Sequence, residues 1–478
     1  MTGHLNSLWV AVLALLFIFM GCNKNINPNI KTGSELNYTI GFPEVNISSV
    51  GYISPENQPY IRVTANVVYG SLIFKSNSDS DTLTSNVNIS YRVKDIDSEQ
   101  LMLSDSDNLV ITNTDNKITE SQEMFTYTKH LDVPLGSYEI KVTLTDQLSS
   151  KSVSHLSNAF ITGEKADNPN ISNVELLAKN NKTDDDFKTI PTYHVASKYD
   201  SLKFRFQVTN TKQYERLTVS SRLMRFRSDT NYARRLGTRD YTSSDIQYKG
   251  LDYDFHETIN ETQRVLTQPG NIFVEINFPT ISRGNYRYEV TISRNNNDVI
   301  ATKARDFSMK SKNFPNVVTV RELARPLVYI MDDDKYEKMM KLKDPAKIKK
   351  RMDEFWLQKM KNLNEARNII EYYYQRVVEA NKKFSNFKEG WKTDKGMVYV
   401  LFGPPIFTDI SSRSGVLFWH YSYSYNLEDR AFLFERVRPY KADFPFHHYI
   451  VDRKFLYNTE VYKQVQLWLN GQIIEQQI

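Results

Sequence analysis

The sequence is poor in the residues that mark several common protein classes. Its 478 residues include one cysteine, 17 glycines and 16 prolines. Internal disulfides are therefore excluded, and collagen-like or proline-rich disordered chains do not fit. Neither charge sign dominates, because 61 lysines and arginines face 56 aspartates and glutamates. A dedicated nucleic-acid binder usually has a far more basic balance, so we expect no nucleic-acid partner.

Aromatic side chains, in contrast, are abundant. The chain holds 29 tyrosines and 26 phenylalanines, and such side chains favour strands and pack on half-buried sheet surfaces. Its length is several times that of an ordinary domain. We therefore expect several domains that are mainly β.

The amino terminus combines an apolar run with the only cysteine. Residues 8–20 are apolar without interruption, and Gly21 and Cys22 follow. This run is shorter than the roughly 20 residues that a bilayer-spanning helix needs, so residues 1–21 are typical of a signal peptide. Residues 19–22 resemble a bacterial lipobox, which implies that Cys22 becomes a thioether to diacylglycerol and anchors the chain to a membrane. An ordinary secretory signal with an unmodified cysteine is the alternative.

A polar tether is expected over residues 22–36. Lys24 and Lys31 are the only charges in residues 23–34, whereas surface-exported lipoproteins of Bacteroidota often carry an acidic run after the cysteine. We therefore expect an outer-membrane lipoprotein on the periplasmic face rather than on the cell surface.

Two tandem Ig-like β-sandwiches are predicted over residues 37–165 and 166–312. Short runs with alternating apolar and polar residues are separated by Asn, Asp, Ser and Gly, which is typical of strands with one buried face. A Gly-x-Tyr phrase followed by alternation occurs at Gly136 and again at Gly284. The repeat indicates two copies of one kind of unit.

A cluster of arginines lies in the second unit. A solvated sheet edge, whose charges prevent pairing with another edge, is the favoured interpretation, and an anionic ligand is the alternative. The cluster consists of Arg222, Arg225, Arg227, Arg234, Arg235 and Arg239.

A helical connector is predicted over residues 313–388. Asp332 and its two neighbours suit a helix start, and Asp344 before Pro345 suits a second one. Residues 335–383 carry 14 lysines and arginines against 7 acids. This basic face is either solvated or available to lipid headgroups or an acidic partner.

The segment from Gly390 to Gly396 reads Gly-Trp-Lys-Thr-Asp-Lys-Gly. We expect a turn in which Gly396 has a positive φ, followed by a strand over residues 397–402. Trp391 is large enough to dock on the preceding helix, and Thr393 and Asp394 can bind backbone amides in the turn.

This segment resembles the motif of the GWxTD-domain family, which is found largely in Bacteroidota, often in secreted or lipid-anchored proteins. The preceding helix adds to the resemblance through Phe355–Trp356 and Arg376–Val377, and about 130 residues from Lys349 onward are covered. The resemblance implies an α+β GWxTD domain over residues 389–478 but no established chemistry. Residues 357–361 keep a helical character, unlike the family's usual loop, so one longer helix is expected here. The motif residues are assigned a structural or interaction role: Gly390, Trp391, Thr393, Asp394 and Gly396.

An aromatic alternation follows the motif. It predicts a strand whose aromatic face is either core or an exposed platform for sugar or peptide. A second strand is expected over residues 431–438, and a helix over 460–470 with Thr459 as cap. The possible platform consists of Trp419, Tyr421, Tyr423 and Tyr425.

No known catalytic fingerprint occurs in the chain. Residues 447 and 448 are the one adjacent histidine pair, and neighbours on a strand face opposite ways, so they do not suit one metal ion. We expect no enzyme, no cofactor and no metal; Asp394 as a general base is a weaker alternative. The function expected is that of an interaction or scaffold component of an envelope assembly or secretion complex, with an outer-membrane or periplasmic protein partner. The alternative is a carbohydrate-binding or carbohydrate-processing surface lipoprotein.

Overall fold

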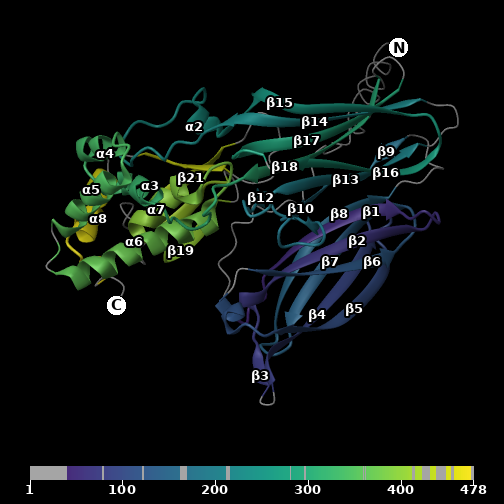
Figure 1. The fold of residues 1–478 in the computed structure, drawn as a ribbon, viewed down its shortest axis with the longest axis horizontal. Helices are drawn as coiled ribbons and strands as arrows, with labels where there is room; N and C mark the ends of the chain where they lie inside the picture. Colours follow the sequence, from purple (N-terminus) through teal and green to yellow (C-terminus); the bar gives the residue numbers. More distant parts are fainter. Residues whose placement is uncertain are drawn as a thin grey trace, which may run out of the picture.

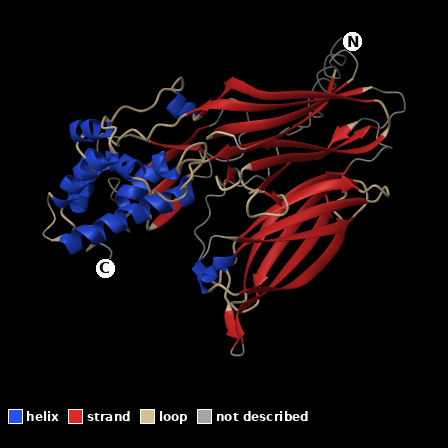
Figure 2. Ribbon diagram, viewed as in Figure 1, coloured by secondary structure: helices blue, strands red, loops and turns tan. Residues whose placement is uncertain are grey.

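The computed structural model describes residues 40–77, 80–120, 123–161, 169–210, 216–279, 281–294, 298–358, 360, 362–411, 415–421, 431–437, 448–453 and 457–474. Strands make up 47% of the structure and helices 23%. Most helices gather at one end, around a small sheet, and two β-sandwiches form the rest of the molecule (Figure 2), which confirms the predicted fold class. No helix in the described ranges is long and apolar enough to cross a bilayer. Cys22 lies outside these ranges.

The first sandwich packs a three-stranded sheet, β1-β2-β6, against a sheet with the order β3-β4-β7-β8 and β5 beside β4. Alternate residues of β4, from Val87 to Val93, point inward and are buried, as the period of two predicts. The elements are β1 (Val45–Ile53), β2 (Pro59–Val68), η1 (Tyr69–Ser71), β3 (Lys75–Asn77), β4 (Ser80–Asp95), β5 (Leu101–Asn113), η2 (Asn116–Glu120), β6 (Met124–Asp132), β7 (Gly136–Asp146) and β8 (Lys151–Ile161).

The second sandwich pairs a sheet of order β11-β10-β13-β16, with β9 beside β13, with a sheet of order β12-β18-β17-β14-β15. Its core contains a stacked pair of rings, Phe204 and Tyr288, with centroids 4.1 Å apart. The elements are β9 (Asn170–Ile171), β10 (Glu175–Lys179), β11 (Lys188–Thr189), β12 (His194–Val195), β13 (Ser201–Asn210), β14 (Leu217–Ser228), α2 (Ile246–Lys249), β15 (Leu251–Leu266), β16 (Gly270–Pro279), β17 (Gly284–Ser293) and β18 (Val299–Met309).

The repeated Gly-x-Tyr phrase has the same structural role in both sandwiches. Tyr138 is the third residue of β7 and donates its hydroxyl to the carbonyl oxygen of Pro134 at 2.8 Å. Tyr286 is the third residue of β17 and donates its hydroxyl to the carbonyl oxygen of Ser282 at 2.7 Å. A tyrosine that hydrogen-bonds a backbone carbonyl a few residues upstream is a recurrent corner of Ig-like sandwiches.

The arginines of β14 do not lie at a sheet edge, so that prediction is wrong. β14 pairs with β17 on one side and with β15 on the other. On the sheet surface, the guanidinium of Arg222 forms an ion pair with the carboxylate of Glu289, with a nitrogen–oxygen distance of 2.7 Å. The position of a strand in a sheet depends on contacts that are distant in the sequence, so the arginine pattern alone could not show it.

The two sandwiches meet around one buried carboxylate. Glu175 on β10 forms ion pairs with Arg62 on β2 and Arg205 on β13, and it accepts the hydroxyl of Tyr52. The backbone of Ile53 pairs with the side chain of Gln207 in both directions. These contacts hold the first sandwich against the second (Figure 1).

The helices and the last sheet share one hydrophobic core, which contains residues from Ala324 to Ile473 together with Ala233 and Leu236. No break in this core separates the predicted connector from the predicted C-terminal domain. The sheet has the order β19-β20-β21-β22. The elements are α3 (Val320–Ala324), η4 (Arg325–Tyr329), α4 (Asp333–Met340), α5 (Pro345–Leu357), α6 (Leu363–Phe384), η5 (Gly390–Lys392), α7 (Asp394–Phe402), β19 (Phe407–Ile410), β20 (Leu417–His420), β21 (Ala431–Val437), β22 (His448–Val451) and α8 (Tyr457–Leu469).

Two of the three predicted helix starts are confirmed, whereas Thr459 does not cap the last helix, because α8 begins at Tyr457 and includes Thr459. The side chains of Asp332 and Asp344 accept backbone N–H groups at the first turns of α4 and α5. The prediction of one longer helix was wrong. Helix α5 ends at Leu357, and α6 begins at Leu363 with Asn362 as its N-cap. The helical character of residues 357–361 was outweighed by this cap.

The predicted strand over residues 397–402 was also wrong, because the segment is helix α7. Thr393 adopts the extended conformation of an N-cap, and its Oγ1 accepts the N–H of Gly396 at 3.0 Å. Gly396 therefore lies in the first turn of a helix. The positive φ belongs to Gly403, at 83°, which ends α7.

Candidate functional site

The two glycines of the GWxTD motif allow backbone segments to approach closely. A Cβ at Gly390 would lie 1.8 Å from the carbonyl oxygen of Ala380 on α6. A Cβ at Gly396 would lie 1.8 Å from the carbonyl oxygen of Gly390. Real Cβ atoms do not come that close, so η5 packs on α6, and α7 packs on η5, only because both positions are glycine.

Trp391 and Thr393 fix the segment between these glycines. Trp391 is buried. Its backbone N–H donates to the side-chain oxygen of Asn381 on α6 at 3.3 Å, and its backbone carbonyl oxygen accepts the hydroxyl of Tyr329 at 2.9 Å. Thr393 Oγ1 donates to the carbonyl oxygen of Gly390 at 2.7 Å while it caps α7. Docking of Trp391 on the preceding helix is therefore confirmed.

Asp394 forms a buried ion pair with Arg453, a residue that the sequence analysis missed. The two guanidinium nitrogens lie 2.8 and 2.9 Å from the two carboxylate oxygens. The carboxylate also accepts the N–H of Val451 at 2.9 Å. Burial lowers the pKa of Arg453, but the nearby Asp394 carboxylate outweighs burial and raises it. Asp394 therefore holds the segment after β22 against the start of α7, and its oxygens are occupied by these contacts.

A long loop of the second sandwich is built into the same structure. Residues 229–250 connect β14 to β15, and Tyr241 in this loop accepts a hydrogen bond from Arg453 at 3.1 Å. Arg235 donates to the carbonyl oxygens of Val328 and Met331, both at 2.7 Å. Ala233 and Leu236, also from the loop, belong to the helical core. The motif thus lies where the second sandwich meets the helical core.

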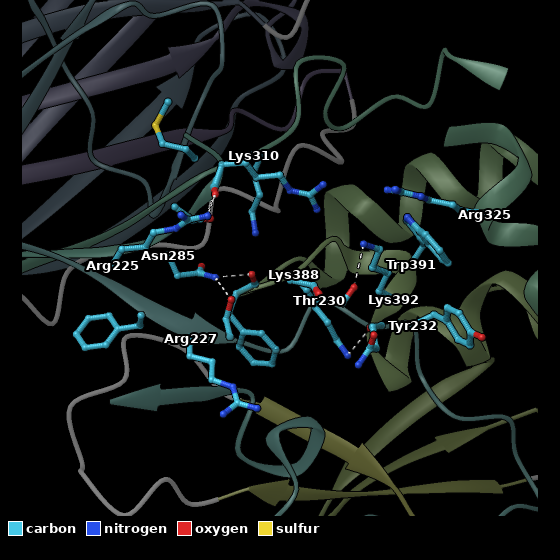
Figure 3. A pocket seen from close by; sticks show the side chains of 18 of the residues that line it. Arg225, Arg227, Thr230, Tyr232, Asn285, Lys310, Arg325, Lys388, Trp391 and Lys392 are labelled. Carbon is cyan, nitrogen blue, oxygen red and sulfur yellow. Dashed lines mark hydrogen bonds between the residues drawn. The ribbon is translucent and has the colours of Figure 1, made fainter. Parts of the chain in front are cut away.

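A cavity of about 1200 Å³ opens at this junction. Its walls come from β14, β15 and the start of β17 on the sandwich side, and from α4 and η5 on the helical side. Trp391 and Lys392 of the motif line it. Figure 3 shows Lys310 and Arg325 extending toward the cavity from opposite sides, and Lys392 extending toward the same space.

Positive charge dominates the cavity wall. The acids among the lining residues are Asp254, Glu257 and Glu337. The lysines and arginines among them are Arg225, Arg227, Arg283, Lys310, Arg325, Lys341, Lys388 and Lys392. Two members of the predicted arginine cluster, Arg225 and Arg227, are thus part of a larger cationic site, while Arg234 and Arg235 bind Asp245 and Asp333 outside it. We call Arg283, Lys310, Arg325, Lys388 and Lys392 the cation cluster.

The members of the cation cluster are close enough to perturb one another. Burial, and after it the charges of Arg283 and Lys392, hold the pKa of Lys310 well below its ordinary value. Burial, and then Arg283, Arg325 and Lys388, lower the pKa of Lys392. Burial and then Arg325 lower the pKa of Arg283. Positive charges that converge and destabilise one another favour a bound anion.

Only part of this charge is neutralised by the protein. Glu389 contacts both Arg283 and Lys392, and Lys388 lies 2.5 Å from the Asp229 carboxylate. Lys310 and Arg325 form no ion pair with any residue that the structure describes.

The other predicted site residues lie elsewhere. Trp419 is buried in the helical core, and Tyr421 packs against it and donates its hydroxyl to the carbonyl oxygen of Gly403 at 2.8 Å. Neither residue contributes to an exposed aromatic platform, and Tyr423 and Tyr425 lie outside the described residues. His448 is buried on β22, and residue 447 is likewise not described. Within the described ranges, no group of three or more His, Cys, Asp or Glu side chains is arranged to hold a metal ion.

The chain contains a GWxTD domain, because the family model of this domain matches residues 291–470. The match begins before the helices, in β17, so it is longer than the expected 130 residues and includes Lys310, Arg325 and the motif. The match does not include Arg225 and Arg283, which lie before its first residue in the second sandwich. No curated protein is similar in sequence.

Several solved structures align with more than half of this chain at low similarity. A red sea bream transglutaminase is 8% identical over 56% of this chain and 31% of its own, with a TM-score of 0.18. An α2-macroglobulin from Salmonella is 12% identical over 59% and 17%, with a TM-score of 0.19. Dimeric latent PorU from Porphyromonas gingivalis is 13% identical over 56% and 20%, with a TM-score of 0.21. The chain spans about a third or less of each of these proteins, and scores this low support no inference about it.

Proposed function

We propose that this protein is a non-enzymatic interaction component of an envelope assembly or secretion complex, and that it binds an anionic partner through the cavity beside the GWxTD motif. The observation that supports this is the charge of the cavity, whose eight lysines and arginines face three acids. Such a surface attracts negatively charged groups and speeds their association.

The structure around the motif supports a binding role for the cavity rather than chemistry at Asp394. Both oxygens of Asp394 are engaged by Arg453, and the carboxylate lies in the core. A general base needs a free oxygen within hydrogen-bond reach of its substrate. In this proposal the motif holds the cavity walls in place.

The proposal also keeps the expected location, in which a lipid on Cys22 holds the protein at the outer membrane with its folded domains in the periplasm. Two or three acyl chains would provide a stable anchor. Mass spectrometry of the natively expressed protein tests this part. An amino terminus that begins with a diacylglyceryl-modified Cys22 is expected, and a free thiol there would overturn the anchor.

Site-specific photo-crosslinking in native membranes tests the interaction. A crosslinking amino acid is placed at Phe255, which is 62% exposed at the cavity. The matched control position is Val110, which is 66% exposed on β5 of the first sandwich. We expect one adduct from position 255 that is absent from position 110 and is weakened by Arg227→Glu, because Arg227 lines the cavity. Equal capture from both positions, or an adduct indifferent to Arg227→Glu, would overturn the proposed use of the cavity.

A further inference from the structure

The cation cluster contains a polar subsite with unused hydrogen-bond donors. Lys310 is 5% exposed, and its Nζ donates to the carbonyl oxygen of Asn386 at 2.5 Å. An ammonium group has three donors, so two stay available. Arg325 lines the cavity, and no hydrogen bond from its guanidinium to any described residue is present. A guanidinium has five donors in a planar fork that suits oxyanions.

The charge of this subsite identifies the class of anion. Glu389 and Asp229 offset part of the charge of Arg283, Lys388 and Lys392. Arg325 then contributes a positive charge that no described carboxylate balances, and Lys310 adds a second one when a bound anion offsets the burial that lowers its pKa. A carboxylate or a phosphodiester brings one negative charge, whereas a phosphate monoester carries about −1.5 to −2 at neutral pH and three acceptor oxygens.

The rest of the cavity has room for a molecule larger than the anionic group alone. Its volume of about 1200 Å³ exceeds the roughly 300–1000 Å³ of common ligand sites. Apolar surface from Tyr232, Tyr336 and Met340 lies on the helical side of the same space. A second hollow of about 30 Å³ is lined by Arg283, Arg325 and Lys392 as well.

We propose, resting on the proposed function, that Lys310, Arg325 and Lys392 bind the terminal phosphate group of the partner, a phosphate monoester. Lys310 and Arg325 donate from opposite sides of the cavity. Lys392, whose Nζ already binds the carbonyl oxygen of Thr230 at 3.1 Å, adds the third charge. The phosphate is carried either by a soluble phosphate ester or by a lipid headgroup, and the chemistry of recognition is the same for both.

Calorimetric titration of the purified full chain with inorganic phosphate tests this proposal, with acetate at equal ionic strength as the control anion. We expect phosphate to bind and acetate not to. Lys310→Met and Arg325→Gln should each weaken phosphate binding about tenfold or more, because each removes charged donors. The matched control Lys141→Met, at an exposed position of β7, should leave the affinity unchanged. Unaltered tryptophan emission will show that the variants are folded.

Flotation with phosphatidylcholine vesicles, with and without phosphatidic acid, then distinguishes the two sources. Retention on the phosphatidic acid vesicles that is lost in Arg325→Gln supports a lipid headgroup, and phosphate binding without retention supports a soluble ester. Equal binding of phosphate and acetate, no phosphate binding, or unchanged affinity in both cavity variants would overturn the phosphate subsite. Position-specific crosslinking at residue 255 could still be observed after any of these results. The phosphate subsite can therefore fail while the proposed function stands.

Discussion

Replacement of Asp394 by Asn tests the structural role of the motif. The variant leaves the guanidinium of Arg453, whose side chain is fully buried, without a counter-charge. Loss of one partner from a buried ion pair typically costs 3–5 kcal/mol, and a negative charge in the first turn of α7 adds up to about 1 kcal/mol through the helix dipole. We therefore expect the GWxTD domain to lose roughly 4 kcal/mol of unfolding free energy.

The tryptophans make this loss measurable in one domain. The chain has five tryptophans; the four in the described residues, Trp356, Trp391, Trp419 and Trp468, all lie in the helical core. Urea unfolding followed by their emission therefore reports on the GWxTD domain, while far-UV circular dichroism also follows the sandwiches.

Two further variants separate the ion pair from general damage. Arg453→Met alone should cost about as much as Asp394→Asn, whereas the double variant should cost less than the sum, because it strands no charge. The matched control Asp353→Asn removes an exposed pair with Lys349 on α5 and should cost about 0.5 kcal/mol or less. If Asp394→Asn cost no more than this control, or if the two single costs simply added, the assigned role of Asp394 would be refuted.

Three other predictions concern separate features. Gly390→Ala and Gly396→Ala should prevent native tryptophan emission, because each new Cβ would lie 1.8 Å from a carbonyl oxygen. The control Gly415→Ala, whose Cβ would have nothing within 4 Å, should cost only about 1 kcal/mol for its positive φ. Native emission in both motif variants would contradict the close packing. Burial lowers the pKa of His448 from 6.5 to about 4, so the unfolded state binds more protons than the folded state between these values. The GWxTD domain should therefore lose roughly 3 kcal/mol of unfolding free energy as the pH falls through this window. If the unfolding free energy of the protein and of His448→Gln had the same pH dependence, this prediction would be contradicted. Tyr138→Phe and Tyr286→Phe should each destabilise their own sandwich by about 1 kcal/mol, measured by calorimetry beside Tyr462→Phe, an exposed tyrosine whose loss should have no effect.

Local patterns predicted the parts of the fold that depend on neighbouring residues. The alternation around Tyr138 and Tyr286 gave two related sandwiches, because a strand with one buried face must alternate. Asp332 and Asp344 gave the helix starts, because capping involves residues two or three positions apart.

Residues 397–402 show why the motif itself was misread. Met-Val-Tyr-Val-Leu-Phe is a short apolar run, and such runs do not distinguish a buried strand from a buried helix. The deciding signal was Thr393, an N-cap residue directly before an acidic first turn, but it was interpreted as part of a turn. Burial on all sides of α7 explains why no helical periodicity was visible.

The cavity could not be found from sequence, because its charges come from distant segments. Arg283, Lys310, Arg325 and Lys392 span more than one hundred residues and meet only where the second sandwich packs against the helical part. Arg225 and Arg227 were recognised as an anion-binding alternative, but the pattern of one strand shows neither its partners nor its place in the sheet. Arg453 pairs with Asp394 across 58 intervening residues and had no local signal.

Anomalous diffraction from crystals soaked in selenate tests the central claim most directly, because selenate is a tetrahedral dianion whose selenium can be located. We predict the strongest selenium peak within hydrogen-bond reach of Lys310 Nζ and the Arg325 guanidinium, and no peak there in crystals of Lys310→Met. Selenate bound only elsewhere on the molecule, with the space between Lys310, Arg325 and Lys392 left empty, would contradict the account.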